Sequence, residues 1–135
     1  MRVRSAVHRV VATTVTFCCV SCSSTSPARP SVAGHWSGAT AVATEQWNVD
    51  LFLTETDSIR GHATVVSTPP RFSEAYVVTG TVSADSLRLV LRPVEDADIH
   101  IAASVSATTL DGLLWLNQFT GQAHPVSLQR MSPLP

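Results

Sequence analysis

From Val32 onward, apolar and polar residues alternate along the chain, and turn residues interrupt the alternation about every ten positions. Successive side chains of a strand point to opposite faces of a sheet, so a period of two is typical of half-buried antiparallel strands. The clearest stretch is 45–54, in which Trp47, Val49 and Leu51 alternate with polar residues. No stretch of this part of the chain shows a helical period.

The alternation and its breaks predict eight consecutive strands, at 32–40, 45–54, 59–67, 74–83, 86–92, 98–105, 109–117 and 124–131. The breaks contain turn residues such as Asp57-Ser58 and Ala84-Asp85, and the connections are short enough for each strand to pair with the next. We therefore expect one all-β domain, a single antiparallel up-and-down meander, with no significant helix outside the N-terminal leader.

A repeated glycine pattern indicates whether this meander stays an open sheet or closes into a barrel. An apolar residue, any residue, Gly, any residue and a second apolar residue follow one another at Gly34, Gly61, Gly80 and Gly112. Each Gly falls on the apolar, inward-facing register. Gly weakens a flat strand but permits the sharp coiling that a small closed barrel requires. The repetition favours closure into an eight-stranded barrel over an open sheet.

Gly34-His35-Trp36 on the first strand and Arg130 on the last resemble the pattern of the calycins, the superfamily of lipocalins, fatty-acid-binding proteins and avidins. In that superfamily, the first-strand Trp packs across the barrel base against an Arg of the final strand. The resemblance implies that Gly34, Trp36 and Arg130 close this barrel, with a guanidinium over an indole face. The whole of 32–131 is compatible with it.

The N-terminal part of the chain has the plan of a secretory signal. Arg2, Arg4 and Arg9 precede an apolar run, 10–20, that contains no charged residue and is shorter than the roughly 20 residues of a membrane span. An ordinary cleaved signal would release a soluble secreted or periplasmic domain.

The end of this leader resembles the lipobox of bacterial lipoproteins, in which a small residue precedes the cysteine that receives the lipid. In Cys19-Val20-Ser21-Cys22 that cysteine is Cys22, although Cys19 stands where Leu is usual. The resemblance implies a signal peptide at 1–22 and a lipid anchor in the cell envelope. Ser23 permits sorting to the outer membrane of a Gram-negative cell.

The segments around the barrel follow from composition. Residues 23–31 are polar and contain two prolines, which predicts a disordered tether; the barrel domain then spans 32–131, and 132–135 form a short tail. All three cysteines lie within 1–22, which leaves the barrel no disulfide or thiolate site. From Cys22 onward, six Arg face ten Asp and Glu, so no basic face is expected for a nucleic acid.

The polar residues of the barrel offer little chemistry. His35, His62, His100 and His124 lack the spacing of a zinc site, and no cofactor or metal is expected. Asp98, His100 and Ser104 share one face, but no nucleophile elbow or oxyanion donor accompanies them. Glu95, Asp96 and Asp98 are interpreted as a solvated turn rather than a calcium loop. The sequence therefore predicts a protein that is not an enzyme.

The inward register predicts an apolar interior without any charged residue. Its members are Trp47, Val49, Leu51, Ile59, Ala63, Val65, Tyr76, Val78, Val82, Leu87, Leu89, Leu91, Ile99, Ile101, Ala103, Leu110, Leu114, Leu116, Val126 and Leu128. An eight-stranded barrel is just wide enough to be filled by side chains or to hold one small ligand. We expect a solid core.

Two functions remain. The first is a lipid-anchored envelope protein that acts on a protein partner through its outer surface, where Phe52 and Trp115 form a candidate patch. A bulge at Gly112 would instead turn Trp115 inward. The second is lipocalin-like binding of a small apolar ligand in a cavity. The cavity would be bordered by Trp47, Gly61, Ala63, Tyr76, Gly80 and Ala103. No motif identifies the ligand or the partner.

Overall fold

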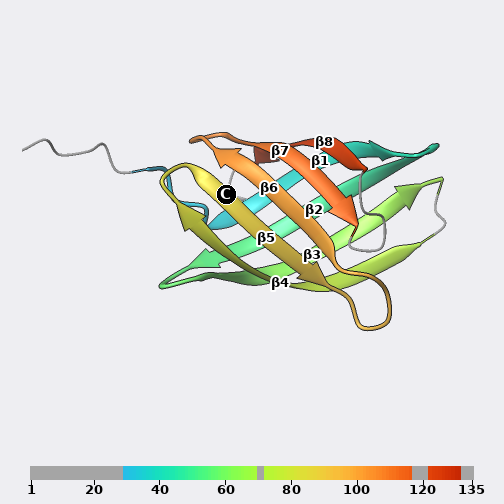
Figure 1. Cartoon of the computed structure of the whole chain (residues 1–135), viewed down its shortest axis with the longest axis horizontal. Helices are drawn as coiled ribbons and strands as arrows, with labels where there is room; N and C mark the ends of the chain where they lie inside the picture. The colour runs from blue at the N-terminus through green and yellow to red at the C-terminus, as the bar shows by residue number, and fades with distance from the viewer. Residues whose placement is uncertain (1–28, 70–71, 117–121, 132–135) are drawn as a thin grey trace, which may run out of the picture.

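The chain forms a closed barrel of eight antiparallel strands in the computed structural model, which describes residues 29–69, 72–116 and 122–131 (Figure 1). The strands are β1 (Gly34–Val42), β2 (Glu45–Glu55), β3 (Ile59–Thr68), β4 (Ser73–Ser83), β5 (Ser86–Arg92), β6 (Ile99–Val105), β7 (Thr109–Leu116) and β8 (Ala123–Arg130). Each strand pairs with the next, and β8 pairs with β1. The predicted fold class is confirmed. The leader and Cys22 lie outside the described residues.

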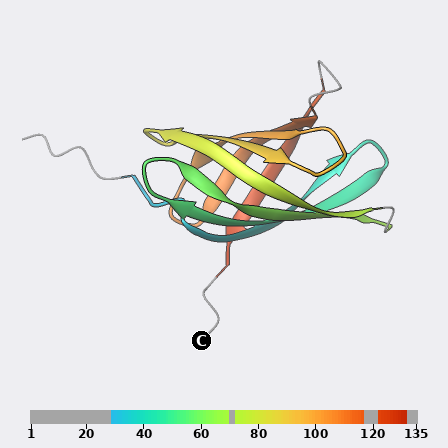
Figure 2. The same ribbon diagram turned by 90° about the horizontal axis from the view of Figure 1, so that it is seen from below.

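No strand is interrupted by a bulge, because every pair of neighbours keeps one register along its length. Following the pairing from strand to strand once round the barrel returns to β1 about ten residues away from the starting point, which is the stagger that tilts the strands. The tilt is visible in Figures 1 and 2. Among the described residues, no helix is long and apolar enough to span a membrane.

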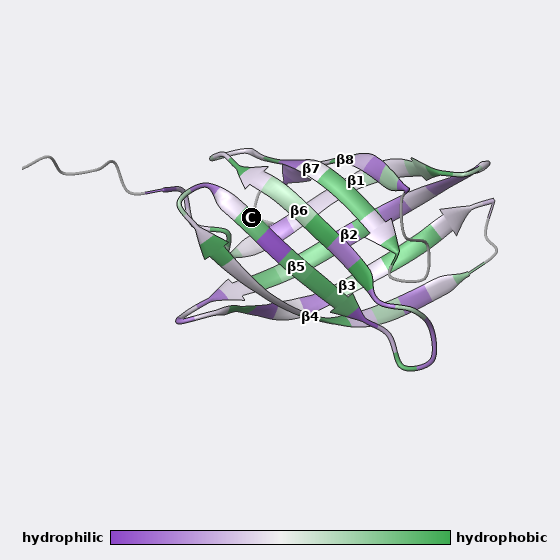
Figure 3. Cartoon of the chain, viewed as in Figure 1, coloured by the Kyte–Doolittle hydropathy of each residue, from purple (hydrophilic) through white to green (hydrophobic). Residues whose placement is uncertain are grey.

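Apolar side chains of every strand fill the interior. In Figure 3, green and purple bands alternate along the strands, as expected when one face is buried and the other meets water. The largest side chains that are fully buried include Trp36, Leu51, Leu89, Ile101 and Leu128. All the residues predicted to face inward are buried or, for Val82 and Leu116, partly buried against the core.

Close approach of neighbouring strands explains two of the repeated glycines. A Cβ on Gly61 would lie 1.9 Å from the carbonyl oxygen of Phe52, and one on Gly112 would lie 1.9 Å from that of Ala102. Both distances are far inside van der Waals contact, so any other residue would force the strands apart. These glycines admit the neighbouring backbone and thereby permit the tight coiling of the barrel.

One end of the barrel, called here the base, is closed by residues 29–33 and by Arg130. Trp36 is completely buried and donates its indole N–H to the carbonyl of Val32 at 2.9 Å. The guanidinium carbon of Arg130 lies 4.1 Å from the centre of the Trp36 ring. A cation in this position is attracted by the ring face. Gly34, which begins β1 two residues before Trp36, has a left-handed φ of +130°.

Arg130 also binds three carbonyl groups around the base. Its side chain donates to Ala107 at 2.9 Å, to Ala33 at 2.7 Å and to Ser31. A planar guanidinium can serve three acceptors and a ring face together, whereas an ammonium group cannot. The base therefore connects β1, β8, the turn after β6 and residues 31–33.

A carboxylate holds residues 29–32 against the base from the side of β2. Glu55 accepts hydrogen bonds from Arg29, from the Ser31 hydroxyl and from the Val32 backbone N–H, the last at 2.9 Å. The Arg29 hydrogen bond, followed by that of Val32, lowers the pKa of Glu55 to about 2. The tether predicted over 23–31 thus includes residues 29–31, which dock on the barrel. This docking also explains why the first strand begins at Gly34, two residues later than predicted.

Replacing Arg130 by Lys should destabilise the barrel although it keeps the positive charge. Lys loses the fork that binds the three carbonyls and part of the contact with Trp36, for which we expect a cost of about 1–3 kcal/mol in the free energy of unfolding. Urea unfolding followed by tryptophan fluorescence measures it. The matched control is Arg88→Lys on the exposed face of β5, which should change stability by less than about 0.5 kcal/mol. Equal stability of the two variants would contradict this role of Arg130.

Candidate functional site

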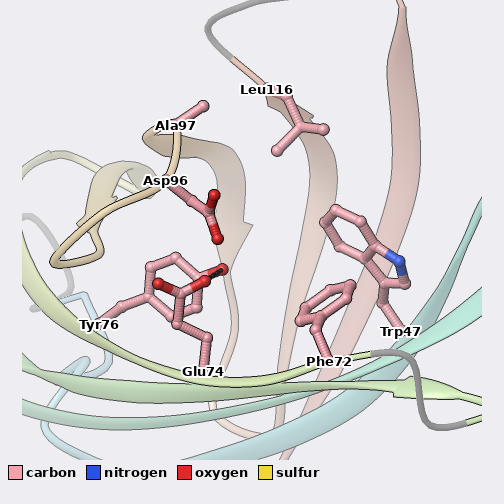
Figure 4. A pocket seen from close by; sticks show the side chains of 7 residues that line it. All are labelled: Trp47, Phe72, Glu74, Tyr76, Asp96, Ala97 and Leu116. Atoms are coloured by element: carbon pink, nitrogen blue, oxygen red, sulfur yellow. Dashed lines mark hydrogen bonds between the residues drawn. The ribbon is translucent and has the colours of Figure 1, made fainter.

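The second end of the barrel, called here the mouth, carries the candidate site. Because the strands form a simple meander, the ends of β1, β3, β5 and β7 and the starts of β2, β4, β6 and β8 all lie at this end, opposite the base. Two hollows open there. The first has a volume of about 190 Å³ and is lined by Trp47, Phe72, Glu74, Tyr76, Asp96, Ala97 and Leu116 (Figure 4). We call it the mouth pocket.

Aromatic rings form one part of the mouth pocket. Trp47 of β2 and Phe72 meet edge to face, with ring centres 5.1 Å apart, and Tyr76 of β4 lies on the other side of the pocket (Figure 4). Trp47 and Tyr76 are almost fully buried. The Trp47 indole N–H donates to Glu45 at 3.4 Å, outside the pocket lining. The rings therefore offer the pocket flat apolar faces and one phenol hydroxyl, which suits a ligand with both apolar and polar parts.

Ser67 determines where Phe72 lies. This buried residue near the end of β3 donates its hydroxyl to the carbonyl of Pro69 at 3.3 Å and accepts the backbone N–H of Phe72 at 3.1 Å. Its own backbone N–H binds the carbonyl of Phe72 at 3.2 Å. These bonds join the two sides of the β3–β4 connection and place the Phe72 ring in the mouth rather than in water.

Two carboxylates form the other part of the mouth pocket. Glu74 comes from β4 and Asp96 from the β5–β6 connection, and their carboxyl groups point toward each other in Figure 4. Burial in the mouth, followed by the neighbouring Asp96, raises the pKa of Glu74. The Tyr76 hydroxyl, 3.4 Å from Glu74 Oε2, opposes this increase by donating a hydrogen bond. The pKa of Tyr76 is itself raised, by burial and by Glu74.

The expectation that no charged residue faces the interior is wrong at Glu74. This residue shares the inward register of β4 with Tyr76 and Val78, and it is partly buried. At the mouth an inward side chain still reaches water, so a carboxylate is tolerated there and not deeper in the barrel. The spacing of two between Glu74 and Tyr76 was the signal for this placement. Asp96 carried no such signal, because a loop has no fixed period.

The cavity predicted from the sequence is only partly reproduced. Trp47 and Tyr76 line the mouth pocket, but the small residues Gly61, Ala63, Gly80 and Ala103 are not among its lining residues. Ala63 and Ala103 belong to the buried core. At Gly61 and Gly80 the place of a side chain is taken by the backbone of the neighbouring strand, with carbonyl oxygens 1.9 and 2.4 Å from an added Cβ. Small residues here mark close packing of strands instead of empty space.

The second hollow adjoins the first. It has a volume of about 180 Å³ and is lined by Val42, Ala43, Leu116, Gln122 and His124. Leu116 lines both hollows, so the two are neighbours across the end of β7. The second hollow adds mostly apolar space to the mouth.

Phe52 and Trp115 both face outward but do not form one patch. Phe52, 39% exposed, lies near the base end of β2 between the rings of His35 and His62, with ring centres 4.1 and 4.9 Å away. Trp115 lies near the mouth end of β7 and stacks on His100 at 5.5 Å. The register of β7 continues through Gly112 without a bulge, which keeps Trp115 on the outer face.

The remaining polar residues considered in the sequence do not converge. Asp98 approaches Arg92 at 3.5 Å, and His100 stacks on Trp115, so these two residues have separate partners. His35 hydrogen bonds with Asp50 at 2.8 Å on the outer face. Within 29–69, 72–116 and 122–131, no three His, Cys, Asp or Glu side chains are grouped as metal ligands.

The structure defines the class of protein as a small closed antiparallel β-barrel with a pocket at its mouth. In comparisons with known proteins, the chain matches no protein-family model, no curated protein and no solved structure.

Replacing Glu74 by Gln should stabilise the fold at neutral pH. Because the folded-state pKa of Glu74 is raised, ionised Glu74 costs free energy in the folded protein above that pKa, and the cost disappears as the pH falls below the ordinary value of 4.5. We expect the Tm at pH 7.5 to rise by roughly 2–5 °C and the gain to vanish near pH 4. Calorimetry at both values measures it.

The control for this prediction is Asp57→Asn in the exposed β2–β3 turn. This change removes one negative charge from the chain without touching the mouth, so its Tm should show no comparable gain at pH 7.5. A gain of the same size in both variants would mean that net charge, and not the surroundings of Glu74, is responsible.

Proposed function

We propose that this chain is a non-enzymatic, lipid-anchored protein of the bacterial envelope whose calycin-like barrel binds a small molecule in the mouth pocket. The observation that carries the proposal is the pocket itself. Side chains fill the interior, whereas at the mouth Trp47, Phe72 and Tyr76 surround a hollow of about 190 Å³. A concave apolar surface with a few converging polar groups is the usual form of a ligand site.

The calycin-like part of the proposal is supported by the base. The strand order is a meander closed by β1 and β8, and the buried Trp36 of the first strand meets Arg130 of the last at 4.1 Å. These are the two features on which the sequence resemblance depends. In such barrels the closed base gives rigidity, and the open end is free to vary for binding.

The proposed lipid anchor gives the barrel an orientation. Arg29 and Ser31 are held at the base through Glu55, opposite the mouth. Cys22, the proposed site of the lipid, precedes Arg29 by seven positions in the chain, a reach of at most about 25 Å. The base would then lie toward the membrane and the mouth pocket would open away from it. Ligands would enter from the aqueous side.

The proposal predicts that the full chain, purified in mild detergent from a bacterial host, carries a small molecule. Native mass spectrometry with organic extraction should show one reproducible extra mass. Trp47→Leu should reduce its occupancy at least fivefold, because the change removes the indole face from the mouth pocket. Trp115→Leu, on the outer face, is the matched control and should retain the molecule.

A bare polypeptide mass for the wild-type chain, together with no binding of added probes, would contradict the proposal. Equal loss of the extra mass in Trp47→Leu and Trp115→Leu would also contradict it. The loss would then not be specific to a change in the mouth pocket.

A second function is favoured by one observation, a row of outward residues that runs from the base end of β2 across β3 to β4. Phe52, 39% exposed, pairs across to His62, and His62 pairs across to Val77, 64% exposed. Exposed apolar side chains in one row offer a surface for a protein partner. Under this proposal, crosslinking in intact cells would yield a partner adduct that Phe52→Ser with Val77→Thr abolishes. An unchanged adduct pattern would contradict a role for this row.

A further inference from the structure

We propose that the mouth pocket binds a small organic cation, an ammonium group attached to a ring-sized apolar body, between the three aromatic side chains and the carboxylates of Glu74 and Asp96. This inference rests on the proposed small-molecule function and names the chemical class of the ligand. It replaces the purely apolar ligand that the sequence indicated.

The charged residues that line the pocket are all acidic. Its two ionisable carboxylates, Glu74 and Asp96, come from separate elements and point toward each other (Figure 4). None of the residues that line the pocket is basic. Arg92, on the neighbouring end of β5, is engaged by Asp98 at 3.5 Å. The two carboxyl groups lie within hydrogen-bond reach of each other, so they repel when both are ionised, and a cation beside the pair reduces this repulsion.

The aromatic residues of the pocket suit the same ligand. Cations bind over the faces of Trp, Tyr and Phe rings, and aromatic side chains combined with carboxylates are a recurring arrangement for amines and quaternary ammonium groups. Trp47 and Phe72 meet edge to face, so their faces are directed differently and enclose a corner of the pocket. The Tyr76 hydroxyl lies 3.4 Å from Glu74 and holds that carboxylate in place.

The volume limits the size of the ligand. An apolar cavity of about 150 Å³ accommodates benzene, so the mouth pocket of about 190 Å³ accommodates one ring and a compact ammonium group. A longer apolar chain would extend past Leu116 into the second hollow of about 180 Å³.

Three probes of one size separate charge from shape. Benzyltrimethylammonium carries a permanent positive charge, benzyl alcohol is neutral and benzoate is negative. Isothermal titration of the full chain in detergent at pH 7.5 gives the affinities, and the indole N–H signals of the three tryptophans locate the binding. We expect the cation to bind at least tenfold more tightly than benzyl alcohol, benzoate not to bind, and the Trp47 signal to shift.

Variants assign the effect to the carboxylates. Glu74→Gln and Asp96→Asn should each reduce the affinity for the cation at least fivefold. The double variant should bind the cation no more tightly than it binds benzyl alcohol. Asp57→Asn in the β2–β3 turn is the matched control and should leave the affinity unchanged. Because Glu74→Gln is expected to raise the Tm, a loss of affinity in this variant would not reflect unfolding.

Arg71 is adjacent in sequence to Phe72 and lies outside the described residues, so Arg71→Gln is included. Cation binding by the wild-type chain supports the proposal, whereas binding by Arg71→Gln alone would show that the chain neutralises its own carboxylates and would overturn it. Equal affinities for the cation and benzyl alcohol, or unchanged affinity in the carboxylate variants, would also overturn it while leaving small-molecule binding intact. No binding of any probe and no co-purified molecule would reject both proposals.

Discussion

Closure of the sheet between β1 and β8 is the constraint on which the rest of the structure depends. This ladder contains only the four pairs from Trp36–Arg130 to Ala39–Ser127, fewer than any other ladder of the barrel. Beyond it, the Thr40 hydroxyl donates to the carbonyl of Pro125 at 2.6 Å and continues the contact toward the mouth. Without the β1–β8 ladder, two strand edges with unpaired backbone groups would be exposed.

The side chains at the base compensate for this short ladder. Arg130 lies over Trp36 and binds carbonyls on two neighbouring segments, and Glu55 holds residues 29–32 from the opposite side. The polar groups at the base are therefore satisfied by one another, which makes this end rigid and closed. At the mouth, Ser67 joins the two sides of the β3–β4 connection, and Glu74 and Asp96 face each other at the pocket. The base is therefore closed by hydrogen bonds, whereas the mouth contains an open pocket.

Much of the architecture could be predicted because a strand has a strict period of two. Trp47, Val49 and Leu51 are buried as their alternation indicates, and the eight strands lie within two residues of their expected starts. The same rule could have placed Glu74 at the mouth, since it shares the face of Tyr76. It could not place Phe72 or Asp96, because both belong to connections whose course depends on hydrogen bonds such as those of Ser67. The glycines show the other limit, because their inward register does not reveal that neighbouring backbone fills the space.

By itself the sequence determined the number of strands, their order and the faces that are buried, because these follow from local alternation and short connections. It also contained the pair of residues, Trp36 and Arg130, that meet at the base. Only the tertiary structure decided that the ligand-sized pocket lies at the mouth and that two carboxylates from distant segments line it. It also decided that Phe52 and Trp115 belong to separate ring stacks. Those outcomes depend on the stagger of the strands around the barrel, which no single strand specifies.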